Sequence, residues 1–250
     1  MQEIAGVACH IIPGLSAFVG GDITAGILAS GMLEQEASTL LIDLGTNGEM
    51  ALGNRHRLHA CATAAGPAFE GGANRGIWGA DMVRLLQKLL EEGLMDGQGL
   101  LKEPYFTKGV RIGDVLVTKE SVRAVQLAKG AIAAGIEILA DSYGIRFSDI
   151  SKVVLAGGFG YYLDPKAAVA IGLLPEELAD CTVTGGNTAL SGAAMVGSRI
   201  LTAGGKQTAE GTLPDGGDDL RKRQELQIRI LNLAEEEKFP ETFLTKINFN

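Results

Sequence analysis

The stretch Leu41-Ile42-Asp43-Leu44-Gly45-Thr46-Asn47-Gly48-Glu49-Met50 decides the fold of this chain. The continuous apolar run over 40–42 predicts a buried strand that ends at Asp43. The segment 45–48 predicts a tight turn, because Asn-Gly is among the strongest hairpin signals. Strands expected over 49–52 and 57–62, with a second turn at 53–54, would extend this hairpin into a meander.

The turn after Asp43 also has the chemistry of a phosphate-binding loop. Gly45 and Gly48 let the main chain approach an anion closely, and the successive N–H groups of Gly45, Thr46, Asn47 and Gly48 can face it. Asp43 would then hold Mg²⁺, in part through water, since Mg²⁺ binds few carboxylates and keeps its waters. The loop is not a Walker A loop, because no Gly-Lys-Ser/Thr follows. An ordinary hairpin turn without a ligand is the alternative.

A second glycine segment, Gly157-Gly158-Phe159-Gly160, follows an apolar run over 152–156 that predicts another buried strand. A helix is expected from Pro165, with Asp164 as its N-cap. Where a nucleoside packs against main chain there is room only for hydrogen, which favours glycine at these positions. The alternative is a tight strand-to-helix crossover. The G-x-G-x-x-G spacing of a dinucleotide fold is absent.

A third segment, over 185–194, is rich in small residues. Asn187 is expected to cap a helix that runs to about Leu201. The small side chains would let this helix pack closely on a neighbouring element. Simple helix packing, without any ligand, is the alternative interpretation of this segment.

Outside these segments strands and helices mix, which predicts the α/β class. Helices are expected over 23–33 with Asp22 as N-cap, over 118–143 with Thr118 as N-cap, and over 81–92 and 239–247. Extended segments are expected over 110–117, 181–184 and 226–230, the last at a sheet edge or half exposed. A long Gly-rich loop is expected over 64–80. We expect a domain over 1–203, a Gly/Pro/Asp-rich linker or loop over 204–219, and a C-terminal strand and helix over 220–250 that pack on the same domain.

Composition excludes several functional classes for this chain of 250 residues. A net charge of −8 argues against a nucleic-acid partner, and 5% aromatic residues argue against a carbohydrate-binding or base-stacking surface.

Cys9, Cys61 and Cys181 are too far apart for a local iron–sulfur site or a disulfide framework, which favours a cytoplasmic location. No apolar run reaches the roughly 18 residues of a membrane span. His56 and His59 would lie on opposite faces of a strand, so a shared metal is not expected.

The order of the three segments resembles the second half of the acetate kinase/sugar kinase/Hsp70/actin fold, where they serve as second phosphate loop, adenosine loop and second connecting helix. A narrower resemblance is to the C-terminal domain of the reductive activators of corrinoid proteins. The motifs that carry it lie at 18–22, 42–50, 64–71 (Ala-Ala-Gly-Pro-Ala-Phe-Glu-Gly), 126–132, 155–160, 171–175 and 186–190. The resemblance implies half of a ribonuclease H-like, actin-like ATPase, with a mixed sheet flanked by helices.

The family's function gives each segment an expected role. In this family ATP hydrolysis drives an uphill electron transfer from a [2Fe–2S] ferredoxin domain to a Co(II) corrinoid, which restores Co(I) in a methyltransferase system. The implied cofactors are ATP and Mg²⁺, and the implied partner is a corrinoid protein, with a homodimer as a further expectation. The expected nucleotide-binding residues are Gly45, Thr46, Asn47, Gly48, Gly157, Gly158, Phe159, Gly160 and Asn187, and Asp43 is the expected catalytic and metal-binding residue.

The chain also departs from the family pattern. It carries neither the ferredoxin domain nor the first Asp-x-Gly-Thr loop, and residues 76–81 read Gly-Ile-Trp-Gly-Ala-Asp where the family usually has Gly-Ile-Cys-Gly-Ser-Gly. We therefore expect half of an ATP cleft, with little or no ATPase activity alone. Two alternatives stay open: a non-catalytic docking or dimerisation module of the same fold, and a small-molecule kinase, for which a substrate-side base is missing.

Overall fold

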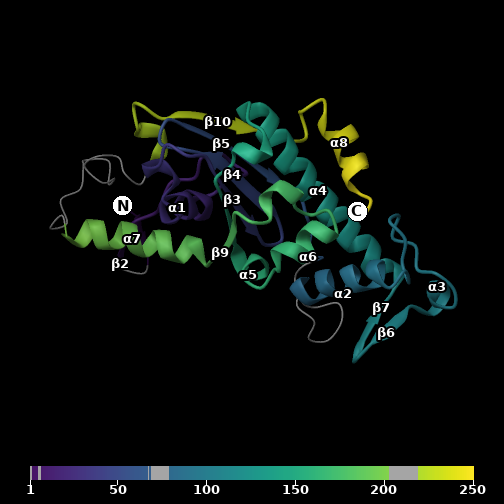
Figure 1. Cartoon of the computed structure of the whole chain (residues 1–250). Helices are drawn as coiled ribbons and strands as arrows, with labels where there is room; N and C mark the ends of the chain where they lie inside the picture. Colours follow the sequence, from purple (N-terminus) through teal and green to yellow (C-terminus); the bar gives the residue numbers. More distant parts are fainter. Residues whose placement is uncertain (1, 5–6, 67, 69–78, 203–218) are drawn as a thin grey trace.

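A six-stranded mixed sheet forms the centre of the molecule in the computed structural model, which describes residues 2–4, 7–66, 68, 79–202 and 219–250 (Figure 1). The strand order is β10-β5-β4-β3-β8-β9. The strands are β3 (Thr39–Leu44), β4 (Gly48–Gly53), β5 (Arg57–Thr63), β8 (Lys152–Ala156), β9 (Thr182–Gly186) and β10 (Gln227–Leu231). The predicted meander is confirmed, because β4 runs antiparallel to both β3 and β5.

The second half of the sheet is parallel. Strand β8 pairs with β3 and β9 pairs with β8, both in parallel, and β10 adds to β5 in parallel at the opposite edge. Asp43 is the register partner of Glu49 on β4 and of Ala156 on β8. The expected α/β fold is therefore confirmed, and the carboxyl ends of β3, β8 and β9 meet at one edge of the sheet.

Helices cover both faces of the sheet and bury two separate apolar clusters (Figure 1). On one face, α1 (Gly21–Ser30) and α7 (Thr188–Thr202) pack over Leu41 and Val154. On the other face, α4 (Lys119–Tyr143) and α2 (Gly79–Glu91) pack over Leu40 and Ile42. Alternate residues of β3 thus enter opposite clusters, and each fully buried leucine or isoleucine contributes about 1.5–3 kcal/mol.

The long helix α4 begins and ends where its sequence predicts. The Thr118 hydroxyl accepts a hydrogen bond from the Ser121 N–H while the Ser121 hydroxyl accepts one from the Thr118 N–H, so a capping box closes the first turn. At the other end Gly144 has φ +76°, which glycine adopts without strain. The predicted helix over 118–143 is confirmed.

The first helix differs from its prediction. Asp22 lies in the first turn of α1, and Gly20 is the N-cap, so the expected capping role of Asp22 is wrong. The helix stops at Ser30 because Gly31 takes φ +71°, and a separate 3-10 turn, η1 (Met32–Glu34), follows. Gly21 also explains the start, since a Cβ there would collide with the Ile12 carbonyl oxygen.

The other elements are short. They are β1 (Gln2–Ile4), β2 (Val7–Cys9), α3 (Tyr105–Lys108), β6 (Val110–Ile112), β7 (Val115–Val117), η3 (Phe147–Asp149), α5 (Gly157–Gly160), α6 (Pro165–Ala170), η4 (Glu176–Leu178), η5 (Leu220–Lys222) and α8 (Phe239–Lys246). The extended segment expected over 110–117 is a hairpin that turns at Gly113, whose φ is +59°. Most of the loops predicted over 64–80 and 204–219 lie outside the described residues.

The C-terminal helix α8 lies along α4 (Figure 1). Lys246 on α8 forms an ion pair of 2.6 Å with Glu137 on α4. Lys129, only 1% exposed, donates from its Nζ to the carbonyl oxygen of Asn248, just beyond α8. The division of the chain at 204–219 stays a prediction.

The structure also places the cysteines and the two histidines. Within the described residues no disulfide joins Cys9, Cys61 or Cys181, and burial raises the pKa of Cys61 to about 12. His56 is exposed beside Glu36, whereas His59 is buried with its Nδ1 3.1 Å from the Ser142 hydroxyl, so the two histidines do not share a metal. None of the described helices combines the length and apolarity needed to cross a bilayer.

Candidate functional site

The first two glycine segments meet in space. Strands β3 and β8 are parallel neighbours, so the turn after Asp43 and the segment after Ala156 emerge side by side. Gly157 has φ +83°, and a Cβ there would collide with Asp43 Oδ1 and lie 2.6 Å from the Leu44 carbonyl oxygen. The convergence predicted from the sequence is therefore present, and glycine is required at 157 by both conformation and space.

Exposed main chain lies on both sides of the contact between Gly157 and Asp43. Gly45, Thr46 and Asn47 are exposed, and the Gly45 N–H donates to the Asn47 carbonyl oxygen at 3.0 Å, which closes the turn. A Cβ on Gly45 would meet only that carbonyl oxygen, at 3.8 Å, and one on Gly158 would meet nothing within 4 Å. A ligand can thus approach the backbone at both glycines.

Three carboxylates gather beside the turn. Asp43 is half-buried, and burial, with the nearby Asp22 charge, raises its pKa to about 6. Glu49 is its cross-strand partner on the same sheet face, and its pKa rises to about 7 through burial and through the charges of Asp22 and Asp43. Both burial and the neighbouring charges disfavour the ionised carboxylates, which a bound cation would favour.

The donor set fits Mg²⁺ held largely by water and phosphate. Within the described ranges no three Asp, Glu, His or Cys side chains form a group able to hold a metal. Mg²⁺ is commonly bound by one or two carboxylates together with substrate phosphates, so a single ligand such as Asp43 suffices. The open backbone at Gly45 and Gly158 leaves room for those phosphates.

Four of the predicted site residues have structural contacts of their own. A Cβ on Gly48 would press on Ile132 and Thr63 at 3.0 Å, and Gly160 lies against Leu155. The ring of Phe159 is buried in the core, which leaves only its main chain for a ligand. The Asn187 side chain accepts from the Leu190 N–H at 2.8 Å and caps α7. Contact of Gly48, Phe159, Gly160 and Asn187 with a nucleotide stays a prediction.

The small-residue helix packs as its sequence predicts. Helix α7 crosses α1 so closely that a Cβ on Gly192 would overlap the main chain of Ala25, with the Cα at 2.7 Å. At the same crossing a Cβ on Gly26 would stand 3.0 Å from Thr188 Oγ1. This close contact fixes the N-terminus of α7, and with it the end of β9, beside the glycine segment of β8.

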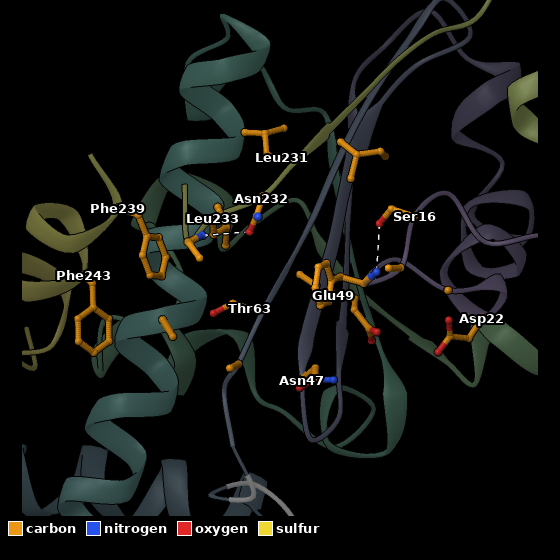
Figure 2. Close-up of a pocket in the computed structure, with 18 residues that line it drawn as sticks. Ser16, Asp22, Asn47, Glu49, Thr63, Leu231, Asn232, Leu233, Phe239 and Phe243 are labelled. Carbon is orange, nitrogen blue, oxygen red and sulfur yellow. Dashed lines mark hydrogen bonds between the residues drawn. The ribbon is translucent and has the colours of Figure 1, made fainter. Parts of the chain in front are cut away.

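A cavity of about 910 Å³ lies beside the β3–β4 hairpin (Figure 2), and Gly157 is not among the residues that line it. Figure 2 shows Asp22, Glu49 and Ser16 on the side of α1, with Phe239 and Phe243 near α4 and α8. The residues that line it are Ser16, Ala17, Phe18, Gly20, Asp22, Asn47, Glu49, Ala62, Thr63, Ala64, Ala131, Ile230, Leu231, Asn232, Leu233, Ala234, Phe239 and Phe243.

The charged side chains of this cavity are acidic. Its lining has two carboxylates, Asp22 and Glu49, and no lysine, arginine or histidine from the described part of the chain. The sequence did not reveal the cavity, because its walls come from segments far apart along the chain; Phe18, within the motif at 18–22, was the one available signal.

The chain is similar in sequence to known proteins. The family model of the C-terminal domain of RACo, the ASKHA domain, matches residues 37–75 and 73–203. The corrinoid activation enzyme RamQ of Eubacterium limosum is 35% identical over a match that covers 66% of this chain and 37% of that protein. The Co(II) methylated amine-specific corrinoid protein reductase of Methanosarcina barkeri is 27% identical, covering 73% of this chain and 43% of that protein.

The chain is also similar in structure to a protein of this kind. A reductive activator for corrinoid,iron-sulfur protein superimposes with a TM-score of 0.79 at 26% identity. The match covers 96% of this chain and 44% of that one. The chain thus spans less than half the length of the relatives that it matches.

Proposed function

Because this chain belongs to the family of C-terminal ASKHA domains of RACo, the reductive activators of corrinoid proteins, we propose that it binds Mg-ATP at the carboxyl ends of β3 and β8. The observation that carries the proposal is the contact of Gly157 with Asp43 and Leu44. Two glycine-lined strand ends, more than a hundred residues apart in the chain, are adjacent there and would form one wall of the site.

Each predicted residue would have a distinct task. The main chain of the turn over 45–47 would face the phosphates, and Gly158 would leave space for the sugar. Asp43 would hold the magnesium ion, which supplies neutralisation of the charge on the transferred phosphoryl group. The raised pKa values of Asp43 and Glu49, caused first by burial and then by neighbouring carboxylates, support this, since a bound cation would favour the ionised forms.

We also propose that ATP hydrolysis drives the reduction of a Co(II) corrinoid to Co(I) on a partner protein. The electrons would come from a [2Fe–2S] ferredoxin domain, as the family resemblance implies. Phosphoryl transfer depends on positioning and charge stabilisation from both walls of a cleft. The chain alone would therefore bind nucleotide but hydrolyse it slowly.

Calorimetry of the purified chain tests the nucleotide site. Titration with ATP should release heat that depends on Mg²⁺, and Asp43→Asn should abolish the Mg²⁺ dependence. Asp114→Asn, at an exposed position in the β6–β7 turn, is the matched control and should behave as wild type. No specific heat with ATP, with or without Mg²⁺, would reject the proposal in favour of a non-catalytic docking module. Hydrolysis at the rate of full-length family members, lost in Asp43→Asn, would reject the half-cleft.

A further inference from the structure

Tyr161 occupies a distinctive position next to the glycine segment of β8. Its N–H donates to the Gly157 carbonyl oxygen at 3.1 Å, which places the residue at the end of α5. Its ring lies against the end of β9, where a Cβ on Gly186 would be 3.6 Å from the ring carbon Cδ2. The residue is nevertheless 52% exposed, so the ring is supported on one side and open on another.

The distance from the 45–48 turn to the ring of Tyr161 matches the length of a nucleotide. Strands β3, β8 and β9 are successive parallel neighbours, with the 45–48 turn, Gly158 and Gly186 at their carboxyl ends. Two strand spacings amount to about 10 Å, which is the scale of a nucleotide from its phosphates to its base. A triphosphate at the turn of β3 would therefore extend past Gly158 and bring its base to the end of β9.

The neighbours of Tyr161 hold its ring in place. Tyr162 meets it edge to face, with ring centroids 4.9 Å apart and planes at 84°. A ring held in this way loses little conformational entropy when a flat ligand stacks on its open face. The preceding aromatic residue, Phe159, is buried in the core and cannot serve.

We propose that Tyr161 stacks on the base of the bound nucleotide, which makes it the base-binding residue of the site. This inference rests on the proposed function, because it takes the nucleotide to lie along the ends of β3 and β8. Stacking on the base requires only one aromatic ring, which agrees with the 5% aromatic content of the chain.

The test compares ATP with inorganic tripolyphosphate, both with Mg²⁺, on the whole chain. Stacking is worth about 1–3 kcal/mol per base, so Tyr161→Ala should weaken ATP binding about 5- to 150-fold. Tripolyphosphate binding should stay within about twofold, and Tyr161→Phe should bind ATP as wild type does. Phe106→Ala, at a 44% exposed aromatic on α3, is the matched control and should change neither.

Proton NMR of the ligand supplies a second measurement. The ring current of Tyr161 should shift the purine H2 and H8 resonances upfield in wild type and Tyr161→Phe, and Tyr161→Ala should lose that shift. If wild type binds both ligands and Tyr161→Ala binds ATP equally well, the stacking role is wrong while the nucleotide site stands. If wild type binds neither ligand, the nucleotide site itself is wrong and the role of Tyr161 falls with it.

Discussion

Gly157 lies directly against the carboxylate of Asp43, so that any Cβ at 157 would collide with Asp43 Oδ1. Residues far apart in the sequence are thus in contact at the ends of adjacent strands. The same glycine has φ +83°, and its neighbour Gly158 borders open space. Of two adjacent glycines, one is required by the fold and the other is available to a ligand.

This difference predicts opposite results for two alanine variants. Gly157→Ala should lower the free energy of unfolding by at least about 1–3 kcal/mol, because it adds both backbone strain and a collision. Gly158→Ala should unfold like wild type yet bind Mg-ATP more weakly, since its methyl group would enter the space for the nucleoside. Urea unfolding and calorimetry measure the two effects. Equal stability of both variants would contradict the contact.

Asp43→Asn should stabilise the chain above pH 6. The pKa of Asp43 rises from 3.8 to about 6, mainly through burial, so ionisation is disfavoured in the folded state. The resulting penalty is absent below pH 3.8, grows between pH 3.8 and 6, and is complete above pH 6. The variant should melt at least about 2 °C above wild type at pH 7 and at the same temperature near pH 3.5. A variant that is less stable at pH 7 would mean that Asp43 is needed for folding.

The crossing of α1 and α7 predicts a second matched pair. Gly192→Ala should destabilise the chain by about 1–3 kcal/mol, because its methyl group would overlap the Ala25 main chain. Gly197→Ala, on the same helix but with nothing within 4 Å, should stabilise it by up to about 1 kcal/mol. Thermal unfolding of both variants measures the difference. If Gly192→Ala were as stable as Gly197→Ala, the close crossing would be wrong.

Lys129 predicts a change of stability at high pH. Burial, with the charge of Lys246, lowers its pKa from 10.5 to about 8, so the protonated form is disfavoured in the folded chain. That penalty is complete below pH 8 and disappears as the pH rises to 10.5. Relative to Lys129→Met, wild type should therefore gain roughly 3 kcal/mol between pH 8 and 10.5. A difference between the two proteins that does not vary with pH would show that Lys129 is not buried.

Local signals predicted the elements that form the site. The apolar run before Asp43, the Asn-Gly turn and the Thr118 cap each depend on a few adjacent residues, and all three were correct. The sequence order of the glycine segments also predicted their convergence, because the family resemblance supplied the sheet topology. The chemistry at Asp43 could thus be proposed before the strands were seen to be neighbours.

The features that the sequence did not predict depend on contacts between residues that are not adjacent in the chain. Asp22 has the residue type of an N-cap, but the contact of Gly21 with Ile12 fixes the start of α1 earlier in the chain. Asp22 instead adds its charge to the acidic cluster and lines the cavity. The packing roles of Gly48 and Phe159 likewise appear only once α4 and the core are in place.

The most direct test of the central claim is to map Mg-ATP onto backbone amide resonances of the isotope-labelled chain. The account predicts that the largest shifts fall on residues 45–47 and on Gly157 and Gly158 together, saturating at a common ATP concentration. Shifts confined to the cavity beside Phe239 and Phe243, or the absence of any shift at both glycine segments, would contradict it.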